Sequence, residues 1–186
     1  MAKRLDRVLV IDVESTCWDR KPPRGQISEI IEIGLCTVDL ATLERRDKRC
    51  IMVKPQRSRI SEFCNELTGI TDDMVENAGD LKEAVAILRD EFRSRERLFA
   101  SWGDYDRGQF QRNCEHYGLE YPFGPTHLNI KNLFSIAYGI SRELGIDAAL
   151  QRVGLQLEGR HHRGVDDAWN IAKLLCLILK RTRRGE

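Results

Sequence analysis

The spacing of apolar residues changes along the chain, and this change predicts the order of strands and helices. Residues 8–11 (VLVI) form a continuous β-branched and leucine run, which predicts a buried central strand that ends at Asp12. Two further apolar stretches, residues 30–40 and 49–53, predict a second and a third strand. Because short turns join these three strands, we expect an antiparallel meander.

From about residue 59 the apolar residues recur every three or four positions, which is the period of an amphipathic helix. Ile60, Phe63 and Leu67 predict a short helix that ends at Gly69, and Thr71 predicts the N-cap of another helical turn. A fourth strand is expected at residues 97–102. Further helices are expected at residues 81–92, 106–117, 130–138, 147–153 and 165–178. This order predicts an α/β fold with a mixed central sheet flanked by helices.

Composition narrows the class of protein. The 186 residues are 41% hydrophobic and 32% charged, as in an ordinary globular protein, and they contain no repeat or Ser/Gly-rich linker. We therefore expect a single domain over residues 1–186, with a core from about 7 to 178 and a basic tail at 179–186. That tail also fits a solvated helix end that complements the helix dipole.

Charge and cysteine usage add two expectations. The net charge of +1 means that a polyanion has to be bound by local basic patches, because the field of the whole molecule is weak. Six scattered cysteines without a secretory signal favour a reduced, cytoplasmic protein, and no apolar run is long enough for a membrane span.

Asp12 and Glu14 are the first candidate functional residues, because they lie two positions apart at the end of the first strand. Residues i and i+2 of a strand project from the same face, so both carboxylates are expected on one side. Neighbouring carboxylates repel each other, burial increases the cost, and a divalent cation relieves both. The pair by itself fits a solvated loop equally well.

Two later segments could supply further ligands. In residues 101–106 (SWGDYD) an apolar strand runs into acids at the start of a helix, where an acid is either an N-cap or a metal ligand. If this strand lies beside the first, its acid reaches the same edge of the sheet. Residues 161–168 (HHRGVDDA) fit a surface turn, or a site in which aspartate binds metal and histidine accepts a proton.

Together, these segments resemble the DEDDh exonucleases of the ribonuclease H-like fold. The similarity extends over residues from about 7 to 178, and residues 63–71 (FCNELTGIT), 101–106 and 159–167 (GRHHRGVDD) resemble the subgroup of histone-mRNA 3′-end and RNAi-regulating exonucleases. The resemblance implies a histidine general base, His162. It implies four catalytic metal ligands, Asp12, Glu14, Asp106 and Asp167.

Two of these assignments required a choice between neighbours. Asp106 is preferred to Asp104 because an apolar residue follows it one helical turn later, as in the family. The pair of His162 and Asp167 is preferred to His161 and Asp166, because the family's D-D-A/S-x-N run places the ligand second.

The resemblance also implies a reaction. Two ions of Mg²⁺ or Mn²⁺ would activate water and stabilise the leaving 3′ oxygen, and nucleoside 5′-monophosphates would be released. We expect short single-stranded 3′ ends as substrate, RNA favoured over DNA, and no accessory module for structured RNA. By the resemblance, the backbone of Ser15 and Thr16 and the side chains of Phe63 and Leu67 contact the terminal base and sugar. Tyr105 or Trp102 stacks on the base, and Arg163 meets a phosphate.

Several of these contacts have other readings. Phe63 and Leu67 fit a plain core role equally well, Tyr105 stands where relatives often carry another aromatic residue, and the tail residues Arg183 and Arg184 are further candidates for phosphate contacts. Two other functions stay open: a proofreading-type DNA exonuclease, and a non-catalytic binding or inhibitory module of the same fold.

Overall fold

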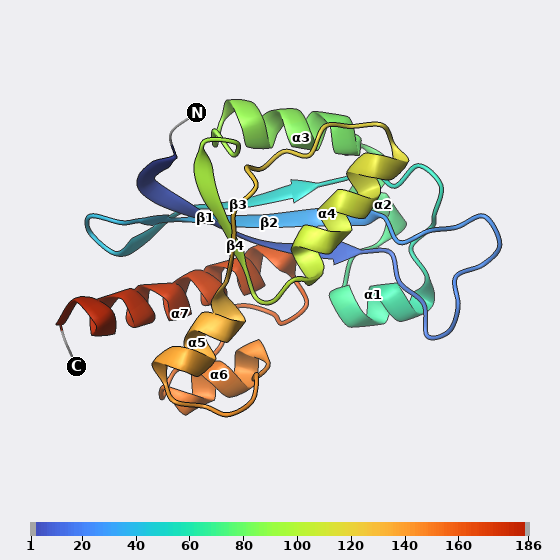
Figure 1. The fold of residues 1–186 in the computed structure, drawn as a ribbon. Helices are drawn as coiled ribbons and strands as arrows, with labels where there is room; N and C mark the ends of the chain where they lie inside the picture. The colour runs from blue at the N-terminus through green and yellow to red at the C-terminus, as the bar shows by residue number, and fades with distance from the viewer. Residues whose placement is uncertain (1–2, 185–186) are drawn as a thin grey trace.

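A mixed five-stranded sheet forms the centre of the structure, a computed structural model that describes residues 3–184 (Figure 1). The strand order is β3-β2-β1-β4-β5, with β2 antiparallel to β1 and to β3, and with β4 parallel to β1 and to β5. The elements are β1 (Arg4–Ser15), β2 (Ile30–Asp39), β3 (Glu44–Met52), α1 (Glu62–Thr68), α2 (Asp72–Glu76), α3 (Leu81–Asp90), β4 (Arg97–Ser101), α4 (Tyr105–His116), β5 (His127–Asn129), α5 (Ile130–Ala137), α6 (Ile146–Arg152) and α7 (Gly164–Arg184).

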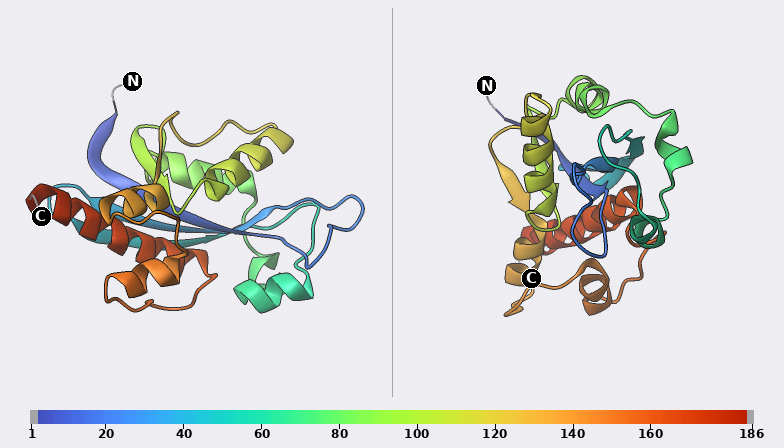
Figure 2. Two further views of the ribbon diagram at one scale, coloured as in Figure 1. Left: turned by 60° about the horizontal axis from the view of Figure 1, so that its bottom comes forward. Right: turned by 90° about the vertical axis from the view of Figure 1, so that its right-hand side faces the viewer.

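Helices cover both faces of the sheet (Figure 2). On β1, Leu9, Ile11 and Val13 face a core shared with α3 and α4, whereas Val8 and Val10 face a core shared with α5, α6 and α7. This alternation is the period of two that a strand buried on both faces requires. It also decides where the acids point, because Asp12 and Glu14 continue the row of Val8 and Val10 towards α7.

The strands confirm the predicted meander and the predicted neighbour relationship of the first and fourth strands. The strands depart from the sequence prediction chiefly in three respects. β1 continues beyond Asp12 to Ser15, so both acids lie within the strand. β3 begins at Glu44, five residues before the predicted start at Arg49, because it is an edge strand whose mostly exposed polar residues give no hydrophobic signal. The short strand β5 was not predicted.

The helices lie close to their predicted positions. α1 ends at Gly69, which has the left-handed φ of 72° that favours glycine. Thr71 is the N-cap residue of α2, although its side chain makes no capping hydrogen bond. α7 continues past residue 178 to Arg184, so residues 179–184 of the predicted basic tail are helical, while 185–186 lie outside the described residues. Among the helices of residues 3–184, none combines the length and apolar character that crossing a bilayer requires.

Candidate active site

β1 holds Asp12 and Glu14 at the centre of the sheet. Asp12 pairs in register with Gly34 of β2, and Glu14 pairs with Glu32. One carboxylate oxygen of each of Asp12, Glu14 and Asp167 lies within 4.8 Å of the others. The spacing of two places Asp12 and Glu14 on the same side of β1, and Asp167 of α7 lies beside them there.

Asp106 reaches the same place from the first turn of α4. It is buried, and its Oδ1 accepts a hydrogen bond of 2.9 Å from the main-chain N–H of Val13, the residue between the two acids of β1. Asp104 is exposed instead, and it accepts a hydrogen bond from Asn129. The geometry therefore favours Asp106 over Asp104 as the third acid of the cluster.

Asp167 depends on a close approach between α7 and the sheet. Gly164, the first residue of α7, packs against Gly34 so tightly that a Cβ atom on Gly34 would lie 1.9 Å from the main chain of Gly164. A Cβ atom on Gly164 would lie 2.9 Å from the carbonyl oxygen of Asp12. Two glycines thus let the first turn of α7 lie directly against β1 and β2, where Asp167 meets Asp12.

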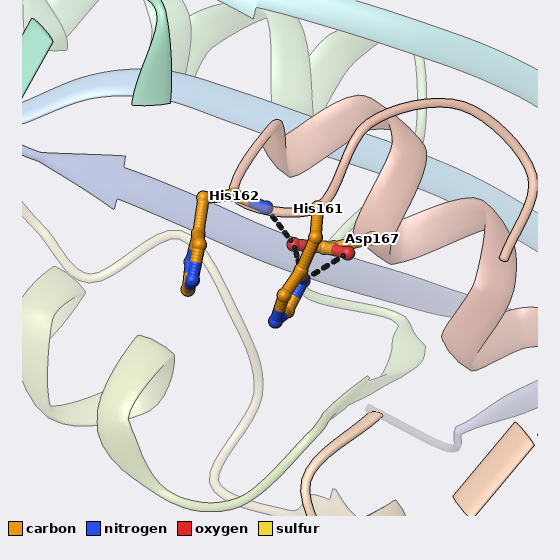
Figure 3. A group of neighbouring side chains, drawn as sticks. All are labelled: His161, His162 and Asp167. Atoms are coloured by element: carbon orange, nitrogen blue, oxygen red, sulfur yellow. Dashed lines mark hydrogen bonds and ion pairs between the residues drawn. The ribbon is translucent and has the colours of Figure 1, made fainter. Parts of the chain in front are cut away.

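The histidine loop, residues 158–163, carries both histidines to Asp167 (Figure 3). The Nδ1 atom of His161 lies 3.0 Å from Asp167 Oδ1, and the main-chain N–H of His162 donates a hydrogen bond of 2.8 Å to Oδ2. His162 has a φ of 61°, a left-handed conformation that is uncommon outside glycine. Its ring stacks on that of His161 at 4.0 Å, so both imidazoles lie beside the same carboxylate.

Asn170 and Asp166 fix this loop onto α7. The buried amide of Asn170 accepts from the N–H of Glu158 at 3.0 Å and donates to the carbonyl groups of Glu158 and Asp166. Asp166 accepts from the N–H of Arg160 at 2.9 Å and pairs with Lys48 at 2.7 Å. In the sequence D-D-A-W-N, the second acid therefore joins the cluster while the first acid and the asparagine hold the loop.

The carboxylates of the cluster resist ionisation. Burial raises the pKa of Asp12 well above its usual range, and the charges of Asp106, Asp167 and Glu14 raise it further. Burial, helped by Asp167 and by Glu32, raises the pKa of Glu14 to about 8. Burial also raises the pKa of Asp106 to about 6 and that of Asp167, in the latter case against the opposing contact with His161.

These pKa shifts agree with the donor chemistry of a metal site. The four acids line one cavity of about 220 Å³. A set of oxygen donors that repel one another is stabilised by hard divalent cations, which prefer carboxylate ligands. The residues of this chain therefore fit divalent metal.

His162 has a different electrostatic setting. Burial, helped by the neighbouring His161, lowers its pKa, which favours the neutral imidazole, the form that can accept a proton. Its ring lines the same cavity as the acids. The position and the protonation state both suit a general base.

Aromatic side chains form the other wall of the cavity. Trp102 and Tyr105 line it, together with Ile146 at the start of α6, a residue that the sequence analysis did not single out. Trp102 is fixed by a hydrogen bond of 3.0 Å from its Nε1 to the carbonyl of Leu144, whereas Tyr105 is 56% exposed. Tyr105 is therefore the freer of the two for stacking.

Phe63 and Leu67 are exposed on α1, at 39% and 37%, so their side chains are not closed into the core. Ser15 is buried, and its hydroxyl has no hydrogen-bond partner among the described residues. Thr16 is fully buried, and its Oγ1 donates to Ile27 and accepts from Glu29. The Thr16 side chain thus supports the turn after β1, and the expected contact of its backbone with the substrate stays a prediction.

Arg163 is engaged within the protein. Its Nε donates a hydrogen bond of 3.0 Å to Glu32 Oε2, and the N–H of Val165 donates to Oε1 of the same carboxylate. Glu32 is completely buried next to Glu14 in the sheet. The sequence does not reveal this pair, because an acid inside an apolar strand gives no sign of which distant cation contacts it.

Comparison with known proteins assigns the family. A family profile described as Exonuclease matches residues 9–175. The 3′-5′ exonuclease Snipper of Drosophila melanogaster is 30% identical over 93% of this chain and 69% of its own length. Human 3′-5′ exoribonuclease 1 is also 30% identical over 94% of this chain, but the chain spans only 53% of that protein.

Solved structures agree in fold and class. The nuclease domain of 3′hExo, described as a DEDDh family member bound to rAMP, matches with a TM-score of 0.86 and 27% identity, over 100% of this chain and 96% of that one. A 3′-exonuclease that recognises the 3′ end of a histone mRNA stem-loop matches with a TM-score of 0.84 and 28% identity, over 96% of this chain and 65% of that one. The predicted ribonuclease H-like fold is thereby confirmed. This chain therefore belongs to the exonuclease family, as a nucleic-acid-binding, divalent-metal-dependent 3′-5′ exonuclease of the DEDDh type.

Proposed function

We propose that this protein removes nucleotides from single-stranded 3′ ends, RNA in preference to DNA, and releases nucleoside 5′-monophosphates. The observation that carries the proposal is the convergence of Asp12, Glu14, Asp106 and Asp167 on one cavity that His162 also lines. A preference for RNA is supported by relatives named exoribonucleases and by a similar structure bound to rAMP.

The chemistry divides between the acids and the histidine. The four carboxylates would hold two ions, Mg²⁺ or Mn²⁺, which when bound activate a water molecule and stabilise the leaving 3′ oxygen. His162, whose lowered pKa favours the neutral imidazole, would accept the proton of the attacking water. Asp167, in the first turn of α7, holds the proposed base close to the metal ligands, because its carboxylate accepts a hydrogen bond from the main-chain N–H of His162.

The terminal nucleotide would lie between the cavity wall and α1. Tyr105 and Trp102 are placed to stack on a base, which contributes about 1 to 3 kcal/mol per base without demanding a sequence. Phe63 and Leu67 would contact the sugar and base with their exposed side chains. Ser15, with a hydroxyl that has no partner among residues 3–184, is a further candidate contact. Arg163 would act through Glu32 rather than on a phosphate.

A cytoplasmic location belongs to the same proposal. All six cysteines are free thiols, four of them buried, as a reducing compartment permits.

One experiment separates the candidate functions. Matched RNA and DNA oligomers of equal length are incubated with the protein and Mg²⁺, Mn²⁺ or a chelator, and the released monophosphates are quantified. We expect release with both ions, faster from RNA, and none with chelator. Faster release from DNA would favour a proofreading-type DNA exonuclease, and no release under any condition would favour a binding module.

The same assay tests the site. Asp12→Ala should abolish release, because one of the four carboxylates is lost. Asp104→Ala is the matched control, because it removes an exposed acid two residues from Asp106. Full activity of Asp12→Ala would show that the acids of β1 do not hold the metal.

A further inference from the structure

Arg160 connects the histidine loop to α1, the two parts of the protein that would lie on either side of the substrate. It belongs to the histidine loop, two residues before His162, whereas α1 carries the exposed side chains of Phe63 and Leu67. In the right-hand view of Figure 2, α1 lies beside the N-terminal end of α7. The arginine spans this junction, since its Nη2 donates a hydrogen bond of 3.3 Å to the carbonyl of Glu66 in the last turn of α1.

The fit between Arg160 and α1 depends on Gly69. A Cβ atom on Gly69 would lie 1.9 Å from Nη1 and 2.7 Å from Cζ of Arg160, so the guanidinium rests directly on the bare Cα of this residue. Gly69 also ends α1 in the left-handed conformation. The glycine thus serves the helix end and the arginine together, and a larger residue would displace the guanidinium.

The other end of Arg160 is anchored to α7. Its main-chain N–H donates to Asp166, which is itself held by Lys48 of β3. A Cβ atom on the preceding Gly159 would lie 2.3 Å from the carboxylate of Asp166, so this contact also needs glycine. Arg160 therefore joins the two sides of the site, since its backbone is hydrogen-bonded to α7 and its side chain to α1.

Charge does not explain where Arg160 lies. Within residues 3–184 no carboxylate forms an ion pair with its guanidinium, which donates instead to the main-chain carbonyl of Glu66. Carbonyl groups in the last turn of a helix lack partners of their own and accept hydrogen bonds from arginine. The contact therefore acts as a cap on α1.

We propose that Arg160 is a positioning residue, which clamps α1 to the histidine loop and thereby sets the width of the space for the terminal nucleotide. This inference rests on the proposed function, because it assumes that the nucleotide lies between α1 and the acidic cavity. A clamp of this kind acts on substrate binding through Phe63 and Leu67, and it leaves the metal ligands where they are.

Hydrogen exchange tests the clamp without any catalysis. Arg160→Gln should speed exchange of the Gly69 N–H and of the α1 amides by about 5- to 10-fold, the loss expected for one capping hydrogen bond. Arg152→Gln, which alters an exposed arginine of α6, is the matched control and should leave α1 unchanged. Unchanged α1 exchange in Arg160→Gln overturns the clamp, even in a protein that proves to have no nuclease activity.

Kinetics then separates a clamp from a phosphate contact. Arg160→Gln should raise KM about tenfold with a smaller change in kcat, and Arg160→Lys should recover part of the loss. The dependence of log KM on log salt should keep its slope, because no phosphate contact is lost. A slope that falls by about one phosphate contact would assign Arg160 to the substrate backbone and overturn the proposal.

A double-mutant cycle links the arginine to its glycine. Gly69→Ala should speed α1 exchange, because alanine is strained in the left-handed conformation and its Cβ displaces the guanidinium, and adding Arg160→Gln should then have little further effect. Fully additive effects of the two changes would show that the residues act independently, contrary to the clamp.

Discussion

Gly34 and Gly164 contact each other through their main chains, since a Cβ atom on Gly34 would lie 1.9 Å from the carbonyl carbon and oxygen of Gly164. Gly34 is also the register partner of Asp12. The contact between a central strand and the first residue of α7 therefore sets how near Asp167 comes to the acids of β1.

Gly34→Ala should lower activity far more than a substitution in an open position. The added methyl group clashes with main-chain atoms of Gly164, which cannot adopt another rotamer as a side chain can. α7 therefore has to shift away from the sheet. We expect a loss of about 1 to 3 kcal/mol in unfolding free energy, as for overpacked cores, together with at least a hundredfold loss of activity. Denaturant unfolding and the nuclease assay measure both. Gly145→Ala is the control, because nothing lies within 4 Å of the Cβ position at that residue. Equal activity of the two variants would show that the close contact is not needed.

Metal-free protein should lose stability as the pH rises. The pKa of Glu14 is raised from 4.5 to about 8, so between these values the folded chain binds more protons than the unfolded chain. The stabilisation by the bound proton is complete below about pH 4.5 and disappears as the pH passes about 8. Because the acids of the cluster titrate together, we expect the unfolding free energy to fall by on the order of 2 kcal/mol. Thermal unfolding with chelator, from pH 6 to pH 9, measures the decline. Adding Mg²⁺ should reverse it, and metal affinity should rise over the same range because binding displaces protons. A metal-free protein that is most stable at pH 9 would contradict the raised pKa values.

Asp12→Asn and His162→Ala should separate metal binding from proton transfer. Asp12→Asn removes a ligand and should abolish release, yet it should raise the melting temperature of the metal-free protein, because asparagine is buried uncharged without the proton that the raised pKa of Asp12 requires. His162→Ala should keep metal binding and lose about 10² to 10⁴-fold in rate, the usual contribution of a general base. Titration calorimetry with Mg²⁺ and the nuclease assay give the two readouts. Loss of metal binding in His162→Ala would assign the histidine to the metal instead.

Asn170→Ala should loosen the histidine loop. The buried amide satisfies the main-chain N–H and carbonyl of Glu158 and the carbonyl of Asp166, at 2.8 to 3.0 Å. Leaving such groups without partners costs about 1 to 3 kcal/mol each, so we expect a loss of roughly 3 kcal/mol in unfolding free energy. Activity should fall further than stability explains, because the loop carries His162. Asn132→Ala, an exposed position in the first turn of α5, is the control for both measurements.

Arg163→Ala should lower the free energy of unfolding more than it weakens RNA binding. Removing the arginine leaves Glu32 completely buried and without its cation, which typically costs 3 to 5 kcal/mol, about the size we expect in urea unfolding. Arg20→Ala, at a side chain that is 94% exposed, should change stability by less than about 0.5 kcal/mol. Should Arg163→Ala leave stability intact and reduce only the salt-dependent affinity for RNA, the arginine would be a phosphate contact after all.

The sequence by itself predicted the order of the elements except β5, and it singled out the acids that the structure brings together. Hydrophobic runs specify β1 and β2 because buried strands must be apolar on both faces, and the end of α1 is marked because glycine alone adopts the left-handed conformation at Gly69 without strain. Asp12 and Glu14 were predicted on one side of the strand by the period of two, and the structure places an oxygen of each within 4.8 Å of the other.

Other features of the fold carried no signal that a sequence shows. β3 was predicted to start too late because an edge strand has an exposed face, so residues 44–48 showed no strand pattern. β5 has only three residues, too few for any period to appear. α7 was predicted too short because its last turns are basic and only its earlier turns pack on the sheet.

Only the tertiary structure decided how the site is supported. The pairing of Glu32 with Arg163, the contact of Gly34 with Gly164, and the span of Arg160 from Asp166 to Glu66 each join residues far apart in the chain. Such partners depend on which surfaces meet when the helices pack on the sheet, and no local period records that choice. The sequence thus specifies the residue types that perform the chemistry, whereas the distances between them are set only when the long-range contacts form.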